Sequence, residues 1–421
     1  MLPLAFEGRW RARGALANAV TRLIKDLAAV GRTRRRREGR DAEKFAACVD
    51  ALVCNFAAIA MASPGRSLVT ARRTRAEGSG LHGKTFVRTL DAMEDAGLIE
   101  QWRGSWSVES SRHEISRSRA TPALLAALPA ALNADCIGML PGPVLDLHSR
   151  KNAAGQTKLL PFPDTAETNL LAAEADAVNA WLTRANVRRR DGVELFLVEA
   201  ADRLPTIASL RAWSLRRVFN HSTLAHGGRL AGGWWLGMSQ RERADRILID
   251  GEPMVELDFV CMVPRVCYAL RGVPWPFGDD RDAPYIVGPH ASRDAWKKWV
   301  NSMLFARRAL GAWVGKTMAD RLAFAAKFGG IDWPEARALV LRRHAALAEA
   351  GGFGCELGML GMRAESDIAV DVVLRLRDQG VPCLPIHDGF AVAASKADVL
   401  REAMVVAAVA RLGVPLAVAI K

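Results

Sequence analysis

The sequence predicts an α+β protein, and three observations support this fold class. Short extended segments alternate with long helical patterns through residues 211–421. Apolar residues recur at helical spacing in the part before residue 110. Half of the 421 residues are hydrophobic, enough for at least one large core and for two or three domains. We therefore expect separate domains in which helices cover β-sheets.

The chain is strongly basic, which bears on its partners. Its formal net charge is +13 and its pI is about 9.9. This balance suits a polyanion, and nucleic acid more than a membrane surface. Part of the excess is local, because a basic arm or helix over residues 1–40 contains the run Arg34-Arg35-Arg36-Arg37. The alternative is a soluble, arginine-rich protein from a GC-rich genome, with the arm as a solvated segment.

The cysteines and the apolar runs indicate where the protein works. The seven cysteines are odd in number and form no CxxC pair, so we expect reduced core residues rather than a disulfide framework or a cysteine zinc site. The N-terminus lacks the apolar core of a signal peptide, and no apolar run is long enough to span a membrane. We expect a cytoplasmic protein without a membrane partner; the sequence does not indicate protein partners.

Residues 41–110 are expected to form one small domain. A helical pattern runs from Phe45 to Met61, and Ser63-Pro64-Gly65 ends it. A second helix follows over Leu81–Met93, with Gly97 as its C-terminal stop. Leu98–Trp102 then alternates like a strand, with Arg103-Gly104 as a turn before a second strand at Trp106.

This order of helix, strand, turn and strand resembles a winged helix-turn-helix domain. The resemblance implies that Lys84 and Arg88 face DNA from the recognition helix and that Arg103 lies at the tip of the wing. The alternative is a small helical domain without a ligand. Residues 111–210 form a helical connecting or thumb-like region, in which proline-rich loops precede a helix over Thr168–Arg184.

Two apolar segments in residues 211–421 each end in an aspartate. They are Val255-Glu256-Leu257-Asp258-Phe259 and Pro385-Ile386-His387-Asp388-Gly389-Phe390. A buried strand that carries a carboxylate at its tip is costly unless the charge is paired or binds a metal. Two such strands can bring Asp258 and Asp388 to one point, as two-metal phosphoryl transfer requires. Taken singly, each aspartate has the alternative of a turn at a strand end.

Four segments in order resemble the palm and fingers of family A DNA polymerases and single-subunit phage-type RNA polymerases. Asp258 to Arg265 is similar to their first palm motif, which opens with an aspartate after a strand. Their fingers-helix motif corresponds to Arg293, Lys297 and Phe305-Ala306, and their third motif to His387-Asp388. Before these, Phe219-Asn220 and Gly227-Gly228-Arg229-Leu230 are similar to a segment that precedes the first motif.

The resemblance implies a right-hand polymerase domain over residues 211–421 and a role for each matching residue. Asp258 and Asp388 would bind two Mg²⁺ ions, with Mn²⁺ as a substitute, and His387 would contact the primer terminus. The nucleotide would be held through its triphosphate and its ring system by Arg293, Lys297 and Phe305. The primer-template would be contacted by Arg229 and Arg265.

Some residues depart from the family pattern. Val263 stands where the DNA enzymes carry a glutamate that excludes the ribose 2′-hydroxyl, and Phe305 stands where the RNA enzymes carry a tyrosine. Gly389 replaces the acid that follows the third-motif aspartate in the DNA enzymes. Val263 would therefore border the nucleotide without discriminating between sugars. We expect both rNTPs and dNTPs to be accepted.

The sequence thus predicts a compact, primase-like, template-directed nucleotidyl transferase. It would act on a DNA template-primer with NTPs or dNTPs in the replication of a phage, plasmid or other mobile element. The first alternative is a non-catalytic DNA-binding replication initiator or regulator with a degenerate palm. The second is a metal-dependent phosphohydrolase that uses the same carboxylates. Among the candidate residues, Arg293 and Lys297 have the alternative of a solvated helix face, and Trp234-Trp235 are expected in the core.

Overall fold

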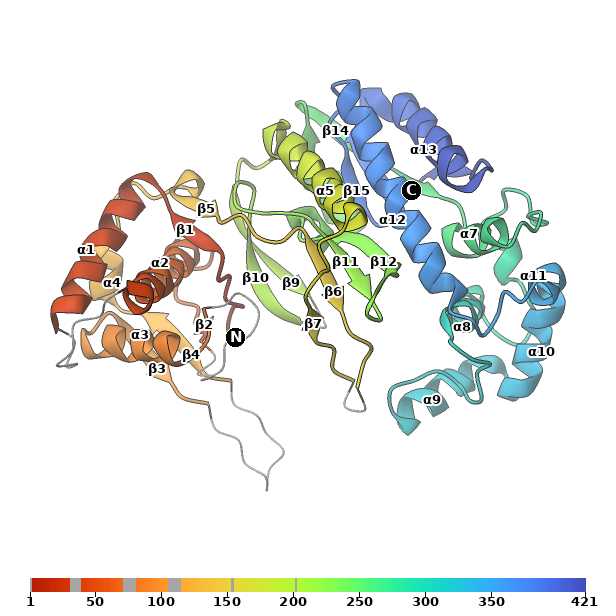
Figure 1. The fold of residues 1–421 in the computed structure, drawn as a ribbon, viewed down its shortest axis with the longest axis horizontal. Helices are drawn as coiled ribbons and strands as arrows, with labels where there is room; N and C mark the ends of the chain where they lie inside the picture. The colour runs from red at the N-terminus through yellow and green to blue at the C-terminus, as the bar shows by residue number, and fades with distance from the viewer. Residues whose placement is uncertain (1, 31–38, 71–80, 105–114, 153–154, 201–202) are drawn as a thin grey trace. The chain divides into compact units, whose positions relative to one another are not determined.

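The computed structural model describes residues 2–30, 39–70, 81–104, 115–152, 155–200 and 203–421 (Figure 1). The chain forms two compact units, and each is built from separated segments. Unit 1 contains residues 1–143, 188–214 and 232–246; unit 2 contains residues 144–187, 215–231 and 247–421. Both contain helices and β-strands, which confirms the predicted mixed content. The expected segment 111–210 is divided between the two units, because its strands pair with residues far away in the sequence.

Unit 1 has a helical core around α2. Its helices are α1 (Gly14–Val30), α2 (Gly39–Ala62), α3 (Lys84–Asp95), α4 (Pro122–Ala127) and α6 (Gln240–Arg246). Within the described residues, α2 is the one helix long and apolar enough to cross a membrane, and 67% of its most apolar window is buried. It packs against α1, α3 and β1 (Trp10–Ala12), as the central helix of a hydrophobic core does.

A three-stranded antiparallel sheet follows α3 in unit 1. Its strand order is β2 (Leu68–Val69), β4 (Arg117–Ala120), β3 (Ile99–Trp102). Trp102 lies opposite Arg117, so the chain returns through residues 103–116 and not through a tight turn at Arg103-Gly104. The expected partner strand at Trp106 lies outside the described residues, as does the arginine run at 34–37.

The remaining strands of unit 1 form two antiparallel pairs. They are β1 with β5 (Ile137–Met139), and β9 (Leu195–Ala200) with β10 (Arg203–Ser209). Trp234 and Trp235 are buried in this unit, and the ring of Trp235 meets that of Trp213 edge-on at 5.0 Å. This confirms their expected place in the core. Strand β8 (Val187–Arg189) lies where the chain passes from unit 2 to unit 1.

The first sheet of unit 2 carries both candidate aspartates. Its antiparallel strands are β13 (Ile247–Ile249), β14 (Glu252–Phe259), β15 (Leu384–Ile386), β16 (Gly389–Ala393) and β17 (Val418–Ile420). β14 lies between β16 and β13, and β17 pairs with the end of β14. Asp258 lies directly opposite Gly389 in this register. The segment that contains Asp388 forms the β15–β16 hairpin, and its second strand, β16, is the neighbour of β14.

The second sheet of unit 2 is attached to a long helix. Its order is β12 (Thr223–Ala231), β11 (Arg216–Asn220), β6 (Leu145–His148), β7 (Leu159–Leu160). The helix α12 (Leu357–Asp378) packs against β12 and, elsewhere, against α13 (Ala397–Leu412) and α7 (Met262–Leu270) (Figure 1). The fully buried Arg217 of β11 binds Asp367 of α12 at 2.5 Å. This charge pair fixes the sheet to the helix.

Glycines allow this close packing of β12 on α12. Gly227 and Gly228 have positive φ angles of 87° and 86°, which glycine adopts at little cost. A Cβ atom on Gly228 would lie 2.9 Å from the Phe219 ring and 3.0 Å from Ser366 Oγ. The glycine pair of the Gly-Gly-Arg-Leu segment is thus required by the strand geometry.

Unit 2 also contains α5 and five helices that share a separate core. They are α5 (Ala166–Arg184), which confirms the helix expected over Thr168–Arg184, together with α7, α8 (Arg293–Phe305), α9 (Met318–Ala325), α10 (Trp333–Arg343) and α11 (Ala345–Glu349). Except for α5, these helices share a core rich in aromatic residues. Ser292 caps α8 by accepting a hydrogen bond from the Ala295 N–H, and this cap sets the start of the helix.

Candidate active site

A hairpin turn and the end of a neighbouring strand bring Asp258 and Asp388 together. Asp388 lies in the turn between β15 and β16, after His387 with its positive φ of 57°. The Phe259 N–H donates to the Asp388 carbonyl oxygen at 3.2 Å. A Cβ atom on Gly389 would lie 3.0 Å from the Leu257 carbonyl oxygen and 3.2 Å from Asp258 Oδ1. Glycine at this position therefore lets the turn approach the Asp258 carboxylate.

The environment of Asp258 disfavours its negative charge. Burial raises the pKa of its carboxyl group, and the nearby Asp388 adds to this effect, while Lys421 opposes it. Asp258 Oδ1 is buried and has no hydrogen-bond partner, whereas Oδ2 lies 3.3 Å from Lys421 Nζ. A buried carboxylate oxygen without a partner is costly, and a bound cation would remove that cost.

Lys421 is part of the site and was not among the residues predicted from the sequence. Strand β17 pairs with β14, with Ile420 opposite Leu257, and this places Lys421 beside the carboxylates. Its Nζ lies 3.3 Å from both Glu256 Oε1 and Asp258 Oδ2. Burial acts to lower the pKa of Lys421, but the two carboxylates outweigh it and raise the pKa. Lys421 is therefore a fixed positive charge.

A second ion pair belongs to the same electrostatic cluster. Arg229 of β12 donates from Nε and Nη2 to both oxygens of Glu365 on α12, at 2.6 and 2.8 Å. Burial raises the pKa of Glu365 despite Arg229, and the charges of Asp388 and Asp258 act in the same direction. Glu256, Asp258 and Glu365 are thus ion-paired with two cations, Lys421 and Arg229. Asp388 adds a further carboxylate beside Asp258, and a divalent cation would offset the repulsion between these two aspartates.

The aspartates line a pocket of about 260 Å³ whose other wall is basic. Arg293 and Lys297, one turn apart on α8, line that wall. Their charged groups lie over the Tyr285 ring, at 5.4 and 5.9 Å from its centroid. Arg293 Nε also donates to Asp282 at 2.6 Å. The carboxylates and the cations of one helix face therefore open into the same space.

The donor atoms fit magnesium. Mg²⁺ prefers oxygen ligands and is commonly bound through one or two carboxylates together with substrate phosphates. Asp258 provides an oxygen without a hydrogen-bond partner, and Asp388 lines the same pocket. These two residues would hold the ion, and the basic face of α8 would meet an anionic substrate.

The other predicted site residues of unit 2 lie in different settings. Val263 lines the pocket near the start of α7. Phe305 is the last residue of α8 and its ring lies against Gly358 of α12, outside the pocket lining. His387 is exposed at the hairpin tip. Arg265 is buried, donates to the Gly278 carbonyl and to Asp279 at 2.9 Å, and stacks over Trp275. Arg265 therefore has partners within the protein at Nη2 and over its guanidinium plane, while its buried Nε has none.

The predicted DNA contacts of unit 1 lie on its surface. Lys84 and Arg88 are exposed on α3, whose opposite face buries Phe86 and Leu90. Arg103 is 63% exposed and lies 3.4 Å from Glu94 and 3.7 Å from Asp91. These exposed ion pairs contribute little to stability, so the side chain can exchange them for another anion.

Comparisons with known proteins give little further guidance. No family model and no curated protein matches the chain. Among solved structures, the polymerase domain of Pol1 from M. smegmatis, in complex with a DNA primer-template and dNTP, is similar over 60% of this chain and 50% of that chain. The identity is 14% and the TM-score 0.28. This chain therefore spans half the length of that structure.

Proposed function

We propose that the protein is a template-directed nucleotidyl transferase, a compact and primase-like polymerase that acts on DNA. The observation that carries the proposal is the Asp258–Asp388 pair, which opens into the same pocket as Arg293 and Lys297. Paired carboxylates opposite a basic helix face are the groups that phosphoryl transfer needs, because it depends on positioning and charge neutralisation. The order of these residues along the chain also resembles the polymerase motifs.

Each group in the pocket has a proposed role. Asp258 and Asp388 hold Mg²⁺, which when bound supplies charge neutralisation at the primer 3′-oxygen and the triphosphate. Arg293 and Lys297 bind the triphosphate, and Asp282 holds the guanidinium of Arg293 in place. Lys421 balances part of the carboxylate charge and leaves Asp258 Oδ1 free to accept the metal.

The α3 region of unit 1 is proposed to bind DNA as a winged helix. A helix with an apolar inner face and exposed Lys84 and Arg88 is followed by an antiparallel strand pair, β3 and β4. Basic side chains of this kind contact phosphates.

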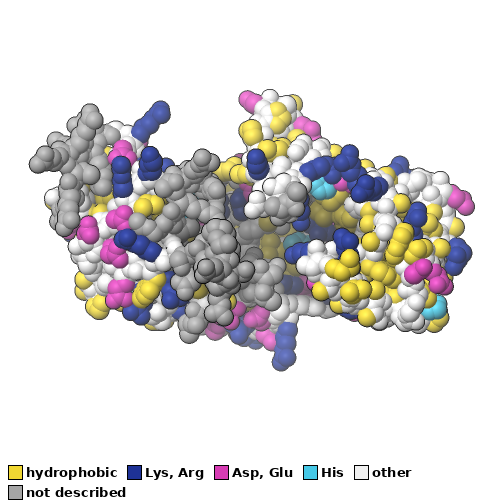
Figure 2. Space-filling view, turned by 90° about the horizontal axis from the view of Figure 1, so that it is seen from below, with side chains coloured by type: hydrophobic (Ala, Val, Ile, Leu, Met, Phe, Trp, Pro, Cys, Tyr) yellow, Lys and Arg dark blue, Asp and Glu magenta, His cyan; other side chains and the backbone are white. Residues whose placement is uncertain are grey.

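Figure 2 also shows Lys and Arg side chains gathered around a hollowed area in the right half of the face it displays. These features suit a polyanionic partner.

The pocket is proposed to accept both ribonucleotides and deoxyribonucleotides. Val263 lines it without a carboxylate that would crowd a 2′-hydroxyl. Phe305, which carries no hydroxyl, lies against Gly358. Neither side chain therefore supplies strong discrimination at the sugar.

The test is nucleotide addition by the purified protein with Mg²⁺ or Mn²⁺, using dNTPs and rNTPs on primed and unprimed templates. The proposal expects products whose sequence follows the template. Release of monophosphates without template dependence would identify a phosphohydrolase instead. DNA binding without any product would identify a non-catalytic initiator or regulator.

A further inference from the structure

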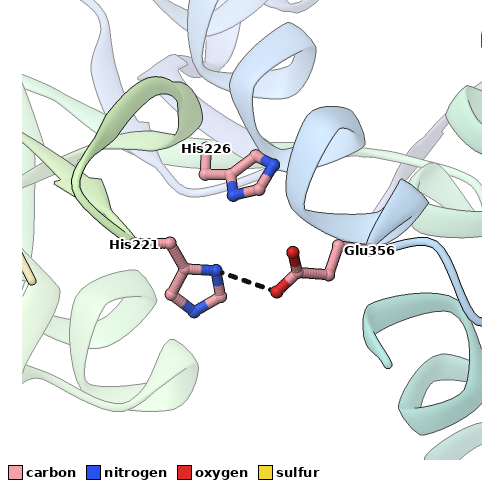
Figure 3. Close-up of side chains that lie close together, drawn as sticks. All are labelled: His221, His226 and Glu356. Carbon is pink, nitrogen blue, oxygen red and sulfur yellow. Dashed lines mark ion pairs between the residues drawn. The ribbon is translucent and has the colours of Figure 1, made fainter. Parts of the chain in front are cut away.

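A second cluster of metal-ligating side chains lies apart from the aspartates, where the β11–β12 hairpin meets the start of α12. His221 lies in the hairpin turn, His226 on β12, and Glu356 immediately before α12 (Figure 3). One ligand atom from each of the three lies within 4.8 Å of the other two. Among the described residues, this is the group of at least three such side chains that could hold a metal ion.

The backbone at this cluster is held in an uncommon conformation. His221, Ser222 and Glu356 have positive φ angles of 59°, 61° and 57°. Non-glycine residues rarely adopt this region, and such residues concentrate at functional sites, where the surrounding structure maintains them. Here two separate elements each present a ligand from a left-handed residue. The convergence of His221 and Glu356 is therefore built into the backbone.

Both histidines bury a ring nitrogen at this cluster. The Nδ1 atoms of His221 and His226 are buried and have no hydrogen-bond partner. His221 Nδ1 lies 3.1 Å from Glu356 Oε1, the contact drawn in Figure 3, without the geometry of a hydrogen bond. The neutral imidazole ring is the form that ligates metals.

Arg150 orients the third candidate ligand. Its Nη1 and Nη2 donate to Glu356 Oε1 and Oε2, each at 2.7 Å. A carboxylate can accept about four hydrogen bonds through its two oxygens, so lone pairs remain. Outer partners of this kind commonly fix a metal-ligating carboxylate.

We propose that His221, His226 and Glu356 bind a first-row transition metal ion, Zn²⁺ above all. Two imidazoles and one carboxylate suit zinc and leave a fourth position for water or a substrate oxygen, whereas Mg²⁺ prefers oxygen ligands alone. Ligand atoms around tetrahedral zinc lie about 3.4 Å apart. The present separations of the three ligand atoms are at most 4.8 Å.

The bound ion would join the hairpin to α12. Arg217 of β11 and Arg229 of β12 already bind Asp367 and Glu365 within α12. A zinc ion at Glu356 would add a further cross-link at the helix start. This inference goes beyond the proposed polymerase activity and does not depend on it.

The test is Zn²⁺ binding by the intact protein, measured by calorimetry in excess Mg²⁺ so that the aspartate site is filled. One equivalent of Zn²⁺ is expected to bind to the wild type. His221→Ala, His226→Ala and Glu356→Gln should each weaken this binding at least about tenfold, because each removes a ligand. His290→Ala, which removes a partly exposed histidine of the α8–α10 region, is the matched control and should bind like the wild type.

Co²⁺ provides a second measurement that does not rely on variants. The wild type in excess Mg²⁺ should give the visible absorption bands of four-coordinate Co²⁺ with nitrogen ligands, and Zn²⁺ should remove them. The melting temperature of each metal-free variant shows whether it folds. Zinc binding by folded His226→Ala that equals the wild type, or a Co²⁺ spectrum of a purely oxygen-ligated ion, would overturn the proposal.

Discussion

Unit 2 contains two clusters of candidate metal ligands, the aspartate pair and the histidine cluster. They are built from similar parts but differ in their donor atoms. In each, a carboxylate lies next to a cation, Lys421 at Asp258 and Arg150 at Glu356. In each, a left-handed residue sits in a hairpin turn. The first cluster offers carboxylate oxygens alone, and the second offers two imidazoles and one carboxylate.

The donor atoms therefore decide what each cluster can do. Oxygen ligands suit Mg²⁺, which exchanges water and phosphate ligands during phosphoryl transfer. Nitrogen ligands suit Zn²⁺, which holds protein segments together or activates a bound water. Five of the six described non-glycine residues with positive φ flank the two clusters: His221, Ser222, Cys261, Glu356 and His387. The strain in this unit is thus concentrated where ligands converge.

The largest expected effect is a loss of nucleotide addition, and it should follow a change at the aspartates but not one at the histidine cluster. Asp388→Asn should lower nucleotide addition about 10³-fold or more, because the metal supplies most of the charge neutralisation. His226→Ala should leave addition in Mg²⁺ within about tenfold of the wild type, since its cluster lies outside the aspartate pocket. Rates of primer extension at saturating Mg²⁺ measure both. Equal losses of nucleotide addition in the two variants would show that the two clusters act as one site.

The next effect compares two arginine–glutamate pairs at α12, Arg229–Glu365 and Arg150–Glu356. Arg229→Ala should destabilise the fold by about 3 kcal/mol, because it leaves the buried charge of Glu365 without a partner. Arg150→Ala should cost at most about 1 kcal/mol, because Arg150 is 43% exposed. Urea unfolding without metal gives both values. Similar costs for the two variants would show that burial does not distinguish the pairs.

Zinc should stabilise the folded protein only by binding at the histidine cluster. At a free Zn²⁺ concentration about 100 times the dissociation constant, the wild type should gain about 2.7 kcal/mol of unfolding free energy. His226→Ala should gain much less, and Asp388→Asn should gain as much as the wild type. Thermal melts with and without Zn²⁺ in excess Mg²⁺ provide the comparison. A full zinc effect in His226→Ala contradicts the assignment of the ligands.

The pH dependence should distinguish Asp258 from an ordinary surface aspartate. Its pKa is raised in the folded state, first by burial and then by Asp388. The native protein therefore binds more protons than the unfolded chain between the unfolded and folded pKa values, and stability falls as pH rises through that window. Metal-free Asp258→Asn should melt at a higher temperature than the wild type at neutral pH and at nearly the same temperature at acidic pH. A constant difference across pH would assign the effect to packing.

The sequence predicted local features well and tertiary pairings poorly. The apolar runs before Asp258 and Asp388 suggested strands with carboxylates at their tips. These runs form β14 and β15, and β16, which follows Asp388, pairs with both. Lys421 was not predicted, because its position depends on the pairing of β17 with β14 from far along the chain.

The other missed contacts have the same cause. Glu365 lies within α12, and only the packing of that helix on β12 shows that it binds Arg229. His226 and Glu356 belong to elements that have no local pattern in common. The division into two units was missed because each is assembled from separated segments. Spacing along a chain reports helix and strand periodicity, but it does not report which distant elements meet.

Binding of Mn²⁺ to the aspartates tests the central claim most directly. Electron paramagnetic resonance of free Mn²⁺ should show binding by the wild type with its histidine cluster saturated by Zn²⁺. Asp258→Asn should lose this binding. Asp250→Asn, at the exposed turn before β14 and also at positive φ, should keep it. The account predicts that loss of Mn²⁺ binding and loss of nucleotide addition occur together in Asp258→Asn. Unchanged Mn²⁺ binding in that variant would contradict it.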